Sequence, residues 1–282
     1  MNKILFLVLW IVTVVTSVQS QHMNIATYNI RYENRGDSLQ GNAWSKRCPV
    51  ICELVRFHDF DLWGAQEVLN SQLNDLQKYL NEYSHVGVGR EDGKTQGEYC
   101  SIFYKTNRFT CLQSGHFWLS PVTDKPNKAW DAALARICTW VRLKDTGSNR
   151  IFWFFNIHFD HVGVTARKES AKLVLSKINE MCGNEPVILV GDFNVDQRNE
   201  SYTLIQNSGR LTDSYEVAKI RYAQTGTFNG FNPNQYSDSR IDHIFVSSGF
   251  DVVRYGILTD SYRDSISLRL PSDHFPVKAV VK

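Results

Sequence analysis

Val187-Ile188-Leu189-Val190-Gly191-Asp192-Phe193-Asn194 is the stretch of this chain from which the fold is best inferred. Its four leading apolar residues, mostly β-branched, predict a buried strand that Gly191 ends. Asp192 and Asn194 are two positions apart, so on an extended backbone they point the same way. A carboxylate and an amide oxygen on one side of a strand end suit a hard cation. The structural alternative is a strand followed by an Asx turn, and the rest of the chain must decide.

The first twenty residues predict a secretory signal peptide. Lys3 supplies a positive charge, residues 4–15 form a nearly unbroken apolar run, and Ser20 is a small residue at a plausible cleavage point. The run is short for a membrane span, although an uncleaved anchor is the alternative. We therefore expect residues 1–20 to be removed, residues 21–282 to form one catalytic or binding domain, and the mature protein to be periplasmic or secreted.

Composition narrows the functional classes. The chain has 31 basic and 29 acidic residues and a formal charge of +2. Proteins that bind long polyanions usually carry a strong basic excess, so bulk charge gives no support for such a substrate. The six cysteines include no CxxC pair, which argues against a cysteine-based zinc site. We expect most of them to be buried thiols, and we expect a monomer without a transmembrane segment in the mature chain.

Hydrophobic periodicity indicates the architecture. Helical spacing of apolar residues predicts helices over 44–57, 71–80 and 165–181, and the first of these should start at or near Pro49. Most other segments are short, apolar and rich in β-branched or aromatic residues, as strands are. Many strands with few helices argue for one α/β or α+β domain in which two sheets pack face to face with helices outside.

Six places in the chain share one pattern, an apolar strand followed by an acid, an amide or an imidazole. They are Asn29, Glu67, His158 with Asp160, Asp192 with Asn194, Asp242, and Asp273 with His274. Each alone has an ordinary explanation, such as a helix cap or a turn. Six together indicate a shared site.

The residue types in this set point to one chemistry. Its carboxylate and amide oxygens are ligands for Mg²⁺, Mn²⁺ or Ca²⁺, and His158 and His274 can transfer protons near neutral pH. A divalent ion that polarises a phosphoryl oxygen, next to a group that activates water, hydrolyses phosphate esters. Paired carboxylates also occur in glycosidases, but the strand-end Asn and His residues do not fit that reaction.

The order of the motifs adds a resemblance that covers essentially the whole mature chain. The motifs are Thr27-Tyr28-Asn29, Gln66-Glu67, Asn156-Ile157-His158, Gly191-Asp192-Phe193-Asn194, Ile241-Asp242-His243-Ile244 and Ser272-Asp273-His274. This ordered set resembles the endonuclease/exonuclease/phosphatase superfamily, and residues 115–140 look like its exported bacterial branch related to deadenylase-like members. The resemblance implies a DNase I-like, four-layered α/β/β/α sandwich of two mixed sheets flanked by helices.

The resemblance also implies a metal site. Glu67 looks like the principal carboxylate ligand of Mg²⁺ or Mn²⁺. Asn29 and Asp273 look like neighbouring ligands, direct or through water.

Catalytic roles are implied for a second group of residues. Asp192 would orient or deprotonate the attacking water, and Asn194 would contact the phosphate. His274, paired with Asp242, would be a general base or a transition-state stabiliser.

A third group is implied around the substrate. His158 would be the second imidazole, paired with Glu98, and Glu98, Tyr99 and Arg136 are candidates for substrate contact. The sequence assigns no role to Asp160 or to His161.

These observations predict an exported, Mg²⁺- or Mn²⁺-dependent phosphoesterase that cleaves P–O bonds by in-line attack of water. Phosphodiesters are favoured, and the substrate classes are nucleic acids, phospholipid headgroups and sugar or inositol phosphates. A phosphatase of inositol or sugar phosphates is the main alternative. A non-catalytic binding module on the same fold is a further one, although Glu67, Asp192 and His274 are all present.

Overall fold

Two mixed β-sheets lie face to face in the computed structural model, which describes residues 22–282. The predicted signal peptide, residues 1–20, lies outside the described residues. The first sheet has the order β10 (Ile220–Tyr222), β12 (Val252–Ile257), β15 (Val277–Val281), β1 (Met23–Asn29), β2 (Leu62–Val68), β4 (Tyr99–Lys105) and β3 (Tyr83–Val86). The second has the order β5 (Phe109–Trp118), β6 (Ile137–Asp145), β7 (Ile151–His158), β8 (Val187–Asp192), β11 (Asp242–Val246) and β9 (Thr212–Asp213).

The stretch 187–192 forms a strand in the middle of the second sheet, as predicted. It pairs in parallel with β7 and antiparallel with β11, and all six of its residues are buried. Gly191 is required where β8 approaches β7, because a Cβ there would lie 2.1 Å from the carbonyl oxygen of Ile157. A larger residue at this position would push Asp192 away from the end of β7.

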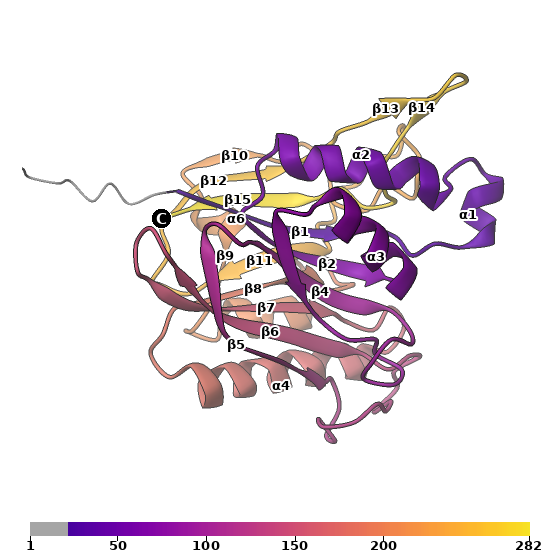
Figure 1. The fold of residues 1–282 in the computed structure, drawn as a ribbon. Helices are drawn as coiled ribbons and strands as arrows, with labels where there is room; N and C mark the ends of the chain where they lie inside the picture. Colours follow the sequence, from indigo (N-terminus) through magenta and orange to yellow (C-terminus); the bar gives the residue numbers. More distant parts are fainter. Residues whose placement is uncertain (1–21) are drawn as a thin grey trace, which may run out of the picture.

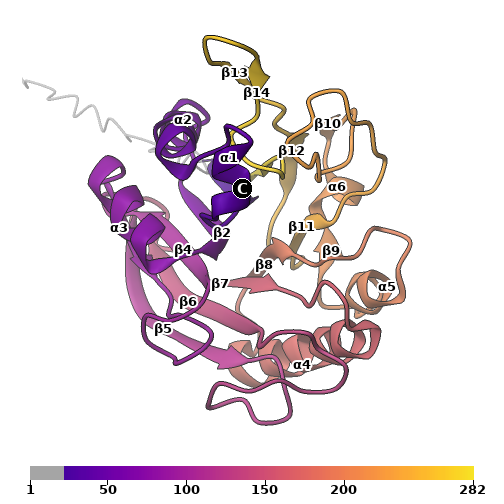
Figure 2. The ribbon, with the colours of Figure 1, turned by 90° about the vertical axis from the view of Figure 1, so that its right-hand side faces the viewer.

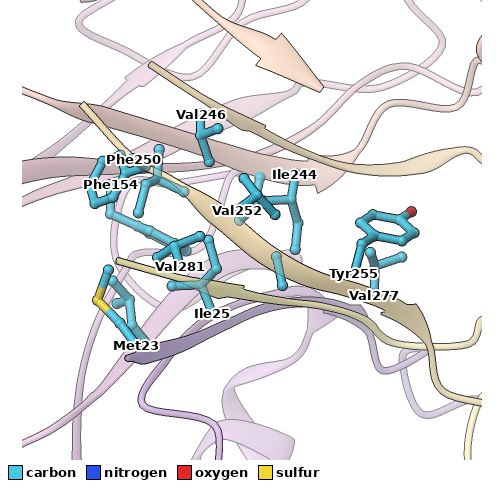
Figure 3. Close-up of a cluster of buried hydrophobic side chains, with 14 of the residues drawn as sticks. Met23, Ile25, Phe154, Ile244, Val246, Phe250, Val252, Tyr255, Val277 and Val281 are labelled. Atoms are coloured by element: carbon cyan, nitrogen blue, oxygen red, sulfur yellow. The ribbon is translucent and has the colours of Figure 1, made fainter. Parts of the chain in front are cut away.

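Apolar side chains from both sheets fill the space between them. Ile25 and Val277 of the first sheet meet Phe154 and Ile244 of the second in one cluster of buried residues, part of which is drawn in Figure 3. Burial of this kind contributes roughly 25 cal/mol for each Å² of apolar surface removed from water. The inter-sheet core thus holds the two sheets together.

Helices cover the outer faces of both sheets (Figures 1 and 2). The helices α2 (Trp44–Phe57) and α3 (Asn70–Tyr79) pack on the first sheet, and α4 (Val164–Cys182) and α5 (Glu200–Gln206) pack on the second. The short helices α1 (Arg35–Leu39) and α6 (Ser214–Val217) and the hairpin of β13 (Tyr262–Arg263) and β14 (Leu268–Arg269) complete the described part. The four-layered sandwich predicted from the sequence is confirmed.

One predicted boundary is wrong. Helix α2 begins at Trp44 and contains Pro49, whereas the sequence predicts a start at or near that proline. Proline lacks the N–H that would bond to the carbonyl four residues back. Helix α2 continues through Pro49 because its inner face, including Trp44, Cys48 and Ile51, is buried against the first sheet. Tertiary packing therefore outweighs the local preference here.

The cysteines are mostly buried thiols, as expected from the sequence. All six cysteines are free, and all except the partly exposed Cys111 are buried. Within residues 22–282, no helix combines the length and the apolar character needed to span a bilayer.

A buried amide pair joins the two sheets beneath the strand ends. The side-chain Nε2 of Gln66 on β2 donates to Oδ1 of Asn156 on β7 at 2.6 Å. Asn156 Nδ2 donates in turn to the carbonyl oxygens of Ala65 and Ser101, at 2.9 and 2.8 Å. Gly64 permits this approach, because a Cβ there would lie 2.6 Å from the Asn156 amide. The pair fixes how β2 and β7 face each other.

Replacing Asn156 tests this role. We expect Asn156→Ala to lower the free energy of unfolding by about 3 kcal/mol, because it removes three buried hydrogen bonds, one from Gln66 and two to backbone carbonyls. Urea unfolding followed by circular dichroism measures the change. The control Asn107→Ala, at an exposed turn residue, should stay within about 0.5 kcal/mol of the wild type. Equal stability of both variants would contradict the assignment.

Candidate active site

The predicted site residues come from both sheets and meet at one end of the sandwich. Asn29 ends β1, and Glu67 lies near the end of the neighbouring strand β2. In the second sheet, His158 ends β7 and is in register with Asp192 at the end of β8. Asp242, which begins β11, is also in register with Asp192. Asp192 therefore stands between a histidine and a second aspartate.

A cavity of about 620 Å³ lies at this end. Its walls include most of the residues predicted from the sequence: Glu67, Glu98, Arg136, His158, Asp192, Asn194, Asp273 and His274. Asn29 and Asp242 are fully buried and contact these residues from behind. The volume is within the range of small-molecule sites.

Tyr99 is the predicted residue that the structure places elsewhere. Its hydroxyl donates to the carbonyl oxygen of Lys94 at 2.9 Å and to Asn70 at 3.1 Å, and it is absent from the cavity wall. In this position it supports the loop of residues 89–97 and does not face a ligand.

Asp192 is oriented by four neighbours. Its Oδ1 accepts a hydrogen bond from the backbone N–H of Asn194 at 2.9 Å, so the Asx turn considered as an alternative is present. That turn directs Oδ2 toward Asn29 Nδ2 at 3.0 Å and toward the Nε2 atoms of His158 and His274 at 3.5 and 3.8 Å. The turn and the candidate active site are thus one arrangement.

Burial and the carboxylate of Asp242 raise the pKa of Asp192 to about 7. Burial alone would lower the pKa of His274, but Asp242 and Asp192 outweigh it and raise that pKa well above its ordinary value. Asp242 Oδ2 lies 2.9 Å from His274 Nδ1 and orients the ring. Burial and Arg136 lower the pKa of His158 well below its ordinary value. The surroundings therefore favour a charged His274 and a neutral His158, on either side of an aspartate that can exchange a proton near neutral pH.

Glu67 is positioned by an irregular strand. The register between β2 and β4 shifts between Ala65 and Val68, and Glu67 has a φ of 60°. A bulge of this kind re-aims a side chain. Glu67 accepts hydrogen bonds from Asn29 Nδ2 at 3.1 Å and from the backbone N–H of Tyr32 at 3.2 Å. Its carboxylate does not cap helix α3, whose N-cap residue is Leu69.

The residues at the cavity fit a divalent cation. Five carboxylates line it, from Asp37, Glu67, Glu98, Asp192 and Asp273, against three guanidinium groups. Burial raises the pKa of Asp273, and the nearby carboxylate of Glu67 raises it further. Oxygen atoms with excess negative charge are what Mg²⁺ or Mn²⁺ requires. Among residues 22–282, two groups of three residues have ligand atoms within 4.8 Å of one another. One is Glu67, Glu98 and His158, and the other is Asp192, Asp242 and His274.

Asn29 joins the two halves of the site. Its Nδ2 donates to both Glu67 and Asp192, while its Oδ1 accepts from the backbone N–H of Arg31. In this orientation the amide nitrogen, and not the oxygen, faces the carboxylates. The metal-ligand role expected for Asn29 stays a prediction, and it requires a turned amide or a bridging water.

Two arginines on loops, Arg90 and Arg136, form part of the cavity wall. Arg90 makes a two-point ion pair with Glu98 at 2.8 and 2.9 Å, and Glu98 lies 3.9 Å from His158 Nδ1. Arg136 Nε donates to Asp160 at 3.3 Å, and its Nη2 lies 2.9 Å from His161 Nδ1. Positive charge is therefore gathered beside the proton-transfer groups.

Asp160, to which the sequence assigns no role, organises the neighbouring loops. Its carboxylate accepts hydrogen bonds from four backbone N–H groups, those of Ala133, Leu134, Val162 and Gly163. Burial alone would raise the pKa of Asp160, but these bonds and the charge of Arg136 outweigh it and hold that pKa far below its ordinary value. Asp160 thus supports the cavity wall that carries Arg136.

Several cavity residues were not identified from the sequence: Arg31, Tyr32, Asp37, Arg90, Leu134, His161, Phe228 and Phe231. Arg31 could have been identified from the sequence, because it follows Asn29 of the first motif by two positions. Asp37 lies on the short helix α1, and the others lie on loops, where no periodicity shows which side chains point inward.

Comparison with known proteins gives a consistent assignment. The model of the Endonuclease/Exonuclease/phosphatase family matches residues 26–274. The structure of a family protein from Bacteroides thetaiotaomicron is 50% identical, with a TM-score of 0.91, covering 93% of this chain and 95% of that chain. A structure described as a mannosyl-6-phosphatase of Bacteroides thetaiotaomicron is 49% identical, with a TM-score of 0.91, covering 92% of this chain and 99% of that chain.

A more distant relative is protein L388 of Acanthamoeba polyphaga mimivirus, 27% identical over 247 residues, which cover 83% of this chain and 90% of L388. The family match spans the strand ends and loops that form the cavity, from β1 to His274. The ordered motifs, the four-layered sandwich and this match agree, and the chain belongs to the endonuclease/exonuclease/phosphatase family of phosphoesterases.

Proposed function

We propose that this protein is an exported, divalent-cation-dependent phosphatase that hydrolyses phosphate monoesters of sugars, with a mannose 6-phosphate group as the first candidate. The observation that carries the proposal is the 49% identity to a mannosyl-6-phosphatase over 92% of this chain. That similarity includes the loops around the cavity as well as the strand ends. The sequence alone favoured phosphodiesters as substrates. We now prefer the alternative that it left open, a phosphatase acting on sugar phosphate monoesters.

The charges at the cavity support this choice. A phosphate monoester carries about two negative charges near neutral pH, and three guanidinium groups and the cationic His274 surround the space beside Asp192. The protein has no large basic excess for a long polyanion. A small dianion is the ligand that these features suit.

The residues of the chain have separate parts in the proposed reaction. Asp192 accepts the proton of the attacking water, for which a pKa near 7 is well matched. His274, held by Asp242, donates to a phosphoryl oxygen as charge develops. A divalent cation bound by Glu67 and Asp273 would polarise the phosphoryl group and offset its charge. Arg90 and Arg136, which are held by Glu98 and Asp160, would add positive potential beside the substrate.

Stability in the absence of a cation should depend on pH through Asp192. Its folded-state pKa of about 7 lies above the unfolded value near 3.9. The folded state therefore holds a proton that the unfolded chain has released, and Asp192 destabilises the fold increasingly as pH rises from 4 to 7. In cation-free buffer, Asp192→Asn should gain thermal stability relative to the wild type between pH 5 and pH 8.

Added Mn²⁺ should also increase the thermal stability of the wild type. It should raise the melting temperature more at pH 8 than at pH 5, because its ligands must be deprotonated. The Glu67→Gln variant should lose most of this increase. Differential scanning calorimetry of the three proteins checks these expectations, and a cation effect that is equal at both pH values would contradict them.

Activity assays test the proposed substrate. Initial rates with Mg²⁺ should be measured on mannose 6-phosphate, glucose 6-phosphate, bis-p-nitrophenyl phosphate, oligoadenylate and single-stranded DNA. We expect a kcat/KM on the best sugar phosphate at least about tenfold above that on any diester, a difference that 1.4 kcal/mol supplies. Asp192→Asn should lower kcat by about 10²–10⁴-fold. A diester as best substrate, or full activity in excess chelator, would refute the proposal.

Export is tested separately on the mature protein. Expression of the full chain in a Gram-negative host, followed by mass spectrometry of the periplasmic fraction, should find an N-terminus near residue 21. A signal peptide requires its apolar core, so replacing Leu7 and Leu9 with Asp should leave the protein unprocessed. An intact Met1 in the purified wild-type protein would contradict the prediction.

A further inference from the structure

Arg31 occupies a conformation that the surrounding chain enforces. Its φ is 58°, which is uncommon for a residue with a side chain. Its backbone N–H donates to Asn29 Oδ1 at 3.0 Å, and its carbonyl accepts from Arg47 Nη2 and Gln72 Nε2, each at 3.0 Å. Arg47 and Gln72 are themselves fully buried. The backbone therefore presents the Arg31 side chain to the cavity.

The side chain makes one hydrogen bond, and its guanidinium carbon lies 4.7 Å from the centre of the Tyr32 ring. Arg31 Nε donates to Asp37 Oδ2 at 2.8 Å. Nη1 lies 3.5 Å from Asp273 and 3.8 Å from Glu67, the two carboxylates proposed to bind the cation. Within residues 22–282, neither terminal nitrogen makes a hydrogen bond, and the side chain is 27% exposed. The two terminal amino groups are thus open to a ligand.

The other arginines of the cavity are already engaged. Arg90 uses both terminal nitrogens on Glu98. Arg136 is held by Asp160 and His161, and its Nη1, which has no hydrogen-bond partner, is buried and cannot turn toward a ligand without breaking these bonds. Of the three, Arg31 is the guanidinium that can reorient its donors without breaking a hydrogen bond at its terminal nitrogens.

We propose that Arg31 is a phosphate-binding residue, whose terminal nitrogens contact an oxygen of the substrate phosphate beside the cation site. The proposal rests on the phosphatase function above. A cation held by Glu67 and Asp273 would add positive charge near Nη1, which lies close to both carboxylates, and the negative charge of a bound phosphate would offset the repulsion. Guanidinium binds phosphate oxygens through two parallel N–H groups. The bond from Nε to Asp37 keeps these groups directed into the cavity.

The alternative is that Arg31 only neutralises Glu67 and Asp273 in the cation-free protein. Arg31→Gln and Arg31→Lys separate the two, with Arg35→Gln as the matched control. Arg35 lies on the exposed face of α1 and is not part of the cavity wall. For each protein the inhibition constant of inorganic phosphate, kcat/KM on mannose 6-phosphate, and the Kd for Mn²⁺ without substrate are measured.

Phosphate binding predicts that Arg31→Gln raises the inhibition constant of phosphate at least about tenfold and lowers kcat/KM similarly, while Mn²⁺ binds as tightly as before or more tightly. Lysine keeps the charge but lacks the two parallel N–H groups of a guanidinium. Arg31→Lys should therefore recover only part of the lost phosphate affinity and kcat/KM. The control should match the wild type. Retained Mn²⁺ affinity also shows that the variant site is folded.

Two results would overturn the proposal. Unchanged phosphate inhibition in Arg31→Gln, together with tighter Mn²⁺ binding, would leave Arg31 as a counter-charge only. Full recovery by Arg31→Lys would show that charge alone matters. A failure of the phosphatase function itself looks different, because the wild type would then neither hydrolyse the sugar phosphate nor be inhibited by phosphate, and Arg31 would have no phosphate to bind.

Discussion

The buried hydrogen bond between Gln66 and Asn156 is the constraint on which the site depends. Each sheet carries half of the active-site residues, and apolar packing between sheets tolerates small slides. A hydrogen bond between two buried amides does not tolerate such a displacement, because it is directional and costly to break. Glu67 follows Gln66 directly, and His158 lies two positions after Asn156. The amide pair therefore sets the distance between the proposed cation carboxylate and the proton-transfer groups.

The site is assembled at a cost in stability. Seven non-glycine residues of the described part have a positive φ, and four of them, Arg31, Glu67, Asn194 and Phe231, line the cavity. Such conformations cost of order 1–3 kcal/mol each and persist where the surroundings enforce them. The excess of buried carboxylates adds electrostatic repulsion. A bound cation would relieve part of this repulsion and so stabilise the folded protein.

The strand ends could be predicted from the sequence, and the loops could not. Asn29, Glu67, His158 and Asp192 each follow an apolar run, and strands of one sheet bring their ends to one edge, so their meeting was foreseeable. Arg90 and Asp160 lie in segments without periodicity, and only tertiary contacts show that one lines the cavity while the other anchors two loops. Helix α2 shows the same limit, because packing carries it through Pro49 against the local preference.

This division between strands and loops bears on how function can be transferred within the family. The strand ends carry the groups proposed for proton transfer and cation binding, which would suit any phosphate ester. Arg31, Arg90, Arg136 and Phe231 stand on loops, and loops decide what fits beside such groups. Shared motifs therefore indicate shared chemistry but not a shared substrate. Similarity at 27% identity therefore supports an inference about the chemistry but not about the substrate. The similarity of 49% identity covers 92% of this chain, and so spans loops as well as strands, and it is at the loops that a sugar phosphate would be distinguished from a nucleic acid.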